Sequence, residues 1–172
     1  MRSAAALGAR LVTVHASGGR EMLAATRSAA EESAGDRCGI LAVTVLTSFD
    51  ASAIEAAWGR PDPVDVESEV LRLAGIAADA SLHGIVCSGK EAQPVRRRFG
   101  DRLALLVPGI RLAGGDAHDQ RRVMTPAAAQ AAGARYLILG RAVTAAPDPA
   151  AAMSRVLDEL RESAAAGSPI AR

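Results

Sequence analysis

Five short apolar segments follow one another along the chain, separated by longer polar and alanine-rich stretches. They are "RLVTVHA" (10–16), "CGILAVTVLTS" (38–48), "HGIVCS" (83–88), "RLALLVPGI" (102–110) and "YLILG" (136–140). Each run is continuously apolar rather than alternating, which is typical of strands that are buried on both faces in a parallel sheet covered by helices. The pattern therefore predicts five buried parallel strands.

The stretches between these runs carry the signals that begin helices. An Asp, Ser or Thr cap precedes a Pro in the first turn or a Glu that completes a capping box. The predicted starts are Asp62 with Pro63, Ser88 with Glu91, Thr125 with Pro126, and Asp148 with Pro149. Strand and helix thus alternate, which predicts an all-parallel α/β domain with right-handed crossovers. We expect residues 1–165 to form this domain and residues 166–172 to be a disordered tail.

Composition narrows the class of protein. The chain has 172 residues, 49% of them hydrophobic and 23% charged, which is enough for one globular domain with a core. Its formal charge of +1 argues against nucleic acid or an anionic membrane as a partner. No long apolar run or signal-peptide pattern is present, so we expect a cytoplasmic protein. Cys38 and Cys87 each adjoin a predicted strand and are expected to be buried thiols rather than a disulfide or metal site.

The chemistry is expected at the carboxyl ends of the strands, where parallel α/β folds bind ligands. Gly140 and Arg141 follow the last apolar run; a glycine lets an anion approach the main chain, and a guanidinium can bind phosphate oxygens in a bidentate manner. A surface arginine in a salt bridge is the alternative interpretation. Arg111 in "PGIR" and Gln120 in "HDQ" add further donors near the same place. Together these residues favour a phosphate site.

Other polar residues at strand ends have weaker signals. Thr47 and Ser48 end the second run, where a hydroxyl or the backbone could contact an amide-bearing base. His15 has no second ligand at metal spacing, and His118 lies near Gln120 but is better explained as a surface residue. No dinucleotide fingerprint or Walker loop occurs in the sequence.

Taken in order, several motifs resemble the orotidine 5'-phosphate decarboxylase family. They are "VTVHASGGREM", "LAVTVLTS", "GIVCSGKEA" and "VPGIRLAGGDAHDQRRVMTPAAAQAAGARYLILGRAVTAAPDP", and they extend from about Met1 to Leu160. The resemblance implies that Arg141 and the Gly140 N–H bind the 5'-phosphate of the substrate. It also implies that Gln120 bridges phosphate and pyrimidine, that Arg111 closes over the phosphate end, and that Thr47 and Ser48 contact the base.

The resemblance further implies an incomplete TIM (β/α)8 barrel. Family members have eight strands, and this chain matches strands four to eight, with Met1 aligned inside the helix after strand three. The family's Asp-x-Lys-x-x-Asp array, whose lysine protonates the ring carbon as carbon dioxide leaves, occurs nowhere in the sequence. Lys90 is the only lysine and matches no catalytic position. We therefore expect no catalytic residue in this chain and no activity from it by itself.

The family implies a homodimer, a nucleotide substrate (orotidine 5'-phosphate, giving UMP), and no metal or organic cofactor. Two alternatives remain open. One is a catalytically inactive module that binds a phosphate or nucleotide, because the substrate contacts are present and the proton donor is not. The other is a different phosphosugar barrel enzyme, such as a relative of hexulose phosphate synthase, which "TVLTS" and "PGIR" with "DQ" make the poorer match.

Overall fold

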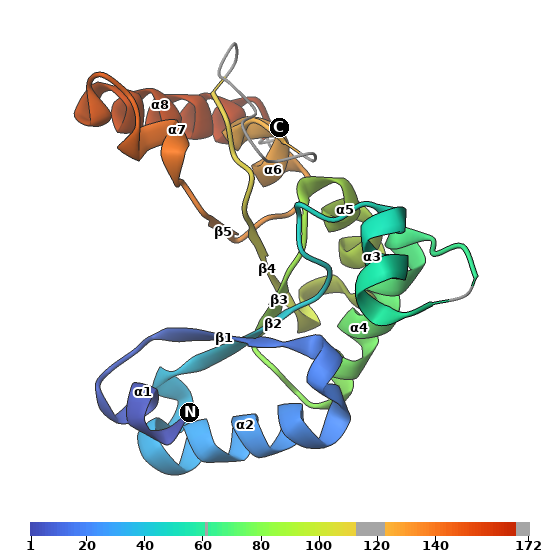
Figure 1. Ribbon diagram of the computed structural model, residues 1–172. Coiled ribbons are helices and arrows are strands. Elements are labelled where there is room, and N and C mark those ends of the chain that lie inside the picture. Colours follow the sequence, from blue (N-terminus) through green and yellow to red (C-terminus); the bar gives the residue numbers. More distant parts are fainter. Residues whose placement is uncertain (61, 113–122, 168–172) are drawn as a thin grey trace, which may run out of the picture.

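The computed structural model describes residues 1–60, 62–112 and 123–167, and in these ranges five strands form one parallel sheet in chain order (Figure 1). The strands are β1 (Leu11–His15), β2 (Gly39–Val43), β3 (Gly84–Val86), β4 (Ala104–Val107) and β5 (Tyr136–Leu137). In the register, Leu11 pairs with Gly39, Leu41 with Gly84, and Leu106 with Tyr136. The five predicted strands and their parallel arrangement are confirmed, although each strand is shorter than its apolar run.

Helices alternate with these strands. They are α1 (Arg2–Ala6), α2 (Gly19–Ala34), α3 (Ala51–Trp58), α4 (Val66–Asp79), α5 (Gly89–Phe99), α6 (Pro126–Ala131), α7 (Arg141–Thr144) and α8 (Pro149–Gly167). Short 3-10 turns, η1 (Ala16–Gly18), η2 (Gly35–Arg37) and η3 (Gly100–Arg102), lie beside them. Helix α8 continues to Gly167, so it includes the first two positions of the expected tail, and residues 168–172 lie outside the described part of the chain.

Three of the four predicted helix starts are confirmed. Ser88 and Glu91 form the capping box of α5, Thr125 caps α6, and the Asp148 carboxylate accepts a hydrogen bond from the Ala151 N–H at 3.0 Å. Helix α3, which we did not predict, begins at the cap Asp50.

The cap predicted at Asp62 is wrong. Helix α4 begins at Val66, and its cap is Asp65, which accepts a hydrogen bond from the Ser68 N–H at 2.9 Å. The physical reason lies in the preceding segment: the Val64 N–H donates to the Glu55 carboxylate at 3.0 Å, so the chain after Asp62 is held against α3 and does not enter the helix. An Asp-Pro pair thus marked the approach to the helix rather than its first turn.

The two faces of the sheet are packed differently. Most buried side chains, including Ile40, Ile85 and Leu105, belong to a core that the strands share with the helices. The other face carries a smaller buried cluster of Leu41, Val86 and Leu106, with partly buried neighbours that come from strands as well. Alternate residues of a strand point to opposite faces, so this second face corresponds to the interior of a β/α barrel.

Candidate functional site

The carboxyl edge of the sheet, where all five parallel strands end, holds a small pocket of about 140 Å³. Arg111, Gly140 and Arg141 line it, together with Pro108, Gly109 and Ile138. The structure therefore brings together three of the residues selected from the sequence. Pro108 and Ile138 were not predicted as site residues. Each lies directly after the last residue of its strand, and this position is the only feature of the sequence that could have indicated them.

The loop after β4 is shaped so that Arg111 reaches this pocket. Gly109 has a φ of +76°, a left-handed conformation that favours glycine. The Met124 N–H donates to the Gly109 carbonyl at 3.2 Å, and the Arg111 N–H donates to the Met124 carbonyl at 3.0 Å. Ile110 and Met124 form a parallel bridge between these bonds. This pairing fixes the backbone around Arg111, whose residue surface is only 8% exposed.

The turn after β5 supplies the second arginine. The Ile138 N–H donates to the Val107 carbonyl at 3.0 Å, so the pairing of β4 with β5 continues up to the pocket. Gly140 caps α7, and a Cβ placed on it would meet no atom within 4 Å, which shows that its backbone faces open space. Arg141 begins α7 and is exposed. Two arginines and a glycine therefore line one small concavity, an arrangement suited to an oxyanion.

The other candidates lie elsewhere. Thr47 is half-buried and Ser48 exposed in the loop between β2 and α3, and neither lines this pocket, because β3 separates β2 from β4. Gln120 and His118 lie outside the described residues. Lys90 is exposed in the first turn of α5, as expected for a solvated residue.

Three further features of the described residues concern cysteines, metal ligands and membrane-spanning helices. Cys38 and Cys87 are buried free thiols, as predicted. No group of three His, Cys, Asp or Glu residues that could hold a metal ion occurs among the described residues. Within the same ranges, no helix has the length and apolar character needed to cross a membrane.

Comparison with known proteins places the chain in a family. Residues 1–156 match the model of the Orotidine 5'-phosphate decarboxylase / HUMPS family. The chain is 48% identical over 166 residues to orotidine 5'-phosphate decarboxylase of Halorhodospira halophila, covering 96% of this chain and 67% of that protein. A relative with the same name from Anaeromyxobacter is 50% identical over 151 residues, covering 88% of this chain and 63% of the relative. The chain thus spans about two thirds of the length of the curated relatives that it matches.

Solved structures agree with the sequence match. The crystal structure of orotidine 5'-phosphate decarboxylase from Lactobacillus acidophilus superposes with a TM-score of 0.74 at 30% identity, covering 92% of this chain and 66% of that one. The structure of orotidine 5'-phosphate decarboxylase from Pyrococcus horikoshii, at 24% identity and a TM-score of 0.62, has the same fold over the matched part. The five parallel strands are therefore part of a TIM barrel, as the resemblance implied. The chain belongs to the orotidine 5'-phosphate decarboxylase / HUMPS family.

Proposed function

We propose that this chain provides the phosphate-binding part of an orotidine 5'-phosphate decarboxylase, which converts orotidine 5'-phosphate to UMP and carbon dioxide. The observation that carries the proposal is the pocket at the ends of β4 and β5, where Arg111, Gly140 and Arg141 meet. In TIM barrels the loops after the last two strands frequently hold a phosphate group. The names of the curated relatives support the same reaction.

In this proposal Arg141 and the Gly140 N–H bind the 5'-phosphate, and Arg111 closes the pocket from the β4 side. Gln120 bridges the phosphate and the pyrimidine, and Thr47 with Ser48 contacts the base. The phosphate lies away from the carbon that loses carbon dioxide, so its binding energy contributes to the rate only where the contacts strengthen in the transition state. Loss of one arginine should therefore lower turnover as well as affinity.

The proton that replaces carbon dioxide needs a positioned acid. The sequence contains no Asp-x-Lys-x-x-Asp array, and its only lysine, Lys90, is exposed at the start of α5. We therefore assign no catalytic residue to these 172 residues, and we expect them to bind UMP without forming it. No metal or organic cofactor is part of the proposed mechanism. The working enzyme is proposed to be a cytoplasmic homodimer.

The test has two measurements on the purified chain. Calorimetry should detect UMP binding, and the Arg141→Ala variant should bind about tenfold to hundredfold more weakly, because it loses a charge-assisted contact worth about 1.5–3 kcal/mol. Arg155→Ala is the matched control, since Arg155 is an exposed arginine of α8 away from the pocket. Equal UMP affinity in the two variants would reject the phosphate site.

The second measurement is UMP formation from orotidine 5'-phosphate by the same chain. We expect none above the uncatalysed rate. Robust turnover would show that a catalytic acid exists among these residues and would overturn the assignment. UMP binding with no turnover is also what an inactive nucleotide-binding module would show. Turnover on adding a polypeptide that carries the missing array would identify the enzyme.

A further inference from the structure

The amino edge of the sheet, where the strands begin, is basic. Arg10 immediately precedes β1, Arg37 lies two residues before β2, and Arg135 immediately precedes β5. His83 holds the corresponding position before β3. Parallel strands begin at one common edge, so residues distant in the sequence meet there. All four line one pocket of about 390 Å³.

The charges in this pocket are unbalanced. Among the residues that line it, Asp36 is the only carboxylate against three arginines, which leaves an excess of two positive charges. Within the described residues none of the three arginines forms an ion pair. Arg37 uses Nε to donate to the Ala34 carbonyl at 3.1 Å, and Arg135 lies 5.8 Å from the centre of the Tyr136 ring. These contacts orient the guanidinium groups without neutralising them.

A histidine and a tyrosine form one wall of the pocket. His83 Nε2 lies 3.1 Å from the Tyr136 hydroxyl, so the two half-buried side chains are hydrogen-bonded across the sheet. A Cβ at Gly39 would lie 2.8 Å from His83 Cγ, so the ring occupies space that only a glycine in β2 leaves open. The pKa of His83 is lowered, first by burial and then by Arg135 and Arg27. The positive charge of Arg135 therefore acts on the ring.

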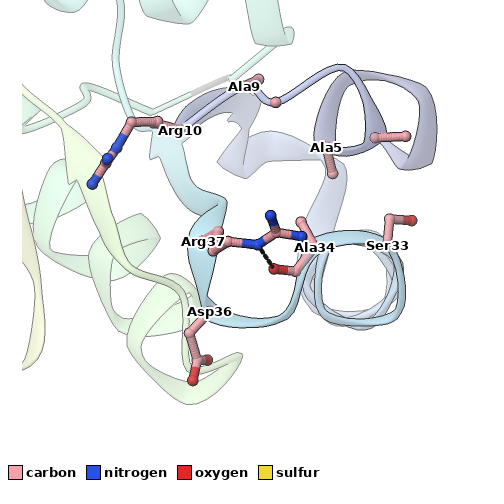
Figure 2. Close-up of a pocket in the computed structure, with 9 residues that line it drawn as sticks. Ala5, Ala9, Arg10, Ser33, Ala34, Asp36 and Arg37 are labelled. Carbon is pink, nitrogen blue, oxygen red and sulfur yellow. Dashed lines mark hydrogen bonds between the residues drawn. The ribbon is translucent and has the colours of Figure 1, made fainter.

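A second pocket adjoins the first. It has a volume of about 480 Å³, lies between α1 and the end of α2, and shares Arg10, Asp36 and Arg37 with the pocket around His83 (Figure 2). Its other lining residues are small, mainly alanines and glycine. In Figure 2 the Arg10 side chain extends away from α1 and α2, whereas Arg37 turns toward the end of α2. The three shared residues thus line both pockets.

We propose that the amino edge is a second anion site, which binds a small phosphate-bearing molecule between Arg10 and Arg135, with Arg37 adding positive charge beside it. One guanidinium group can bind two phosphate oxygens at once. A ligand with two or more negative charges also matches the excess of two positive charges among the residues that line the pocket. The site lies at the opposite end of the strands from the proposed 5'-phosphate pocket and shares no residue with it. It would therefore be occupied independently of the substrate.

Pyrophosphate is the probe, and the imidazole C–H signals of His83 in proton NMR spectra of the 172-residue chain are the readout, assigned with His83→Gln. We expect a saturable shift of these signals at pyrophosphate concentrations below about 10 mM. Arg135→Ala should weaken binding at least about fivefold, because one charged hydrogen-bonding partner is lost. Arg155→Ala, a change on exposed α8, should leave the affinity unchanged.

Pyrophosphate could also enter the pocket at the carboxyl edge, so the titration is repeated with Arg141→Ala. A shift of the His83 signals that persists in this variant and weakens in Arg135→Ala supports the second site. Three results overturn it: no saturable shift, equal affinity in Arg135→Ala and Arg155→Ala, or loss of the shift in Arg141→Ala alone. The first two outcomes leave UMP binding at Arg141 untouched, and the third would favour the carboxyl-edge pocket, so the two proposals fail separately.

Discussion

Replacing Gly84 by a larger residue would create a severe steric clash with a neighbouring strand. It begins β3 and pairs with Ala104 of β4. A Cβ on Gly84 would lie 2.0 Å from the Ala104 carbonyl oxygen, 2.8 Å from its carbonyl carbon and 3.0 Å from its Cα. All three are backbone atoms of a paired strand, so no side-chain rotation can relieve the clash. The Gly84→Ala variant must separate β3 from β4 or distort both.

Forced overpacking in a core costs about 1–3 kcal/mol, and we expect Gly84→Ala to lie at the upper end because the contact is with backbone. A loss of about 3 kcal/mol lowers the melting temperature of a domain of this size by roughly 6–12 °C. With a urea m-value of about 2 kcal/mol/M, the unfolding midpoint falls by about 1.5 M. Urea denaturation followed by far-UV circular dichroism measures this change.

Gly75→Ala is the matched control. Gly75 lies inside α4, and a Cβ there would meet only Phe99 Cζ, at 4.0 Å, which is an ordinary contact. The same substitution should therefore stabilise the protein by about 0.5–1 kcal/mol through helix propensity. Both variants lose similar backbone freedom in the unfolded chain, so the difference between them isolates the clash. Equal urea midpoints for Gly84→Ala and Gly75→Ala would refute the packing of β3 on β4.

Three further predictions concern charge. In a longer relative, replacing by Ala the arginine that matches Arg141 should lower kcat/KM by about 2–4 kcal/mol equivalent; a loss below about fivefold in steady-state assays contradicts this. Hydrogen bonds from Ser68 lower the pKa of Asp65. The difference in free energy of unfolding between the wild-type chain and Asp65→Asn should therefore shrink as pH falls below 3.8, and urea midpoints measure it. Burial and Arg135 lower the pKa of His83, so stability should be lost as pH falls below 6.5, and His83→Gln should remove that loss.

The sequence by itself determined the five strands, three of the eight described helix starts and part of the candidate site. Continuous apolar runs can be buried only between layers, and caps act within a single turn, so both are local signals. Gly140 and Arg141 could be selected for the same reason, because a glycine and an arginine that follow an apolar run lie toward the carboxyl end of its strand. The error at Asp62 also has a local cause in part, since Asp65 competes for the same role three residues later.

Only the tertiary structure decided which strand ends lie close together. The meeting of Arg111 with Arg141 depends on the pairing of Met124 with Gly109 and Arg111, which are more than ten positions away in the sequence. The cluster of Arg10, Arg37 and Arg135 depends on the shared starting edge of strands separated by more than a hundred residues. Sheet register and loop pairing are long-range contacts, and neither the hydrophobic period nor a cap encodes the distance between two strand ends.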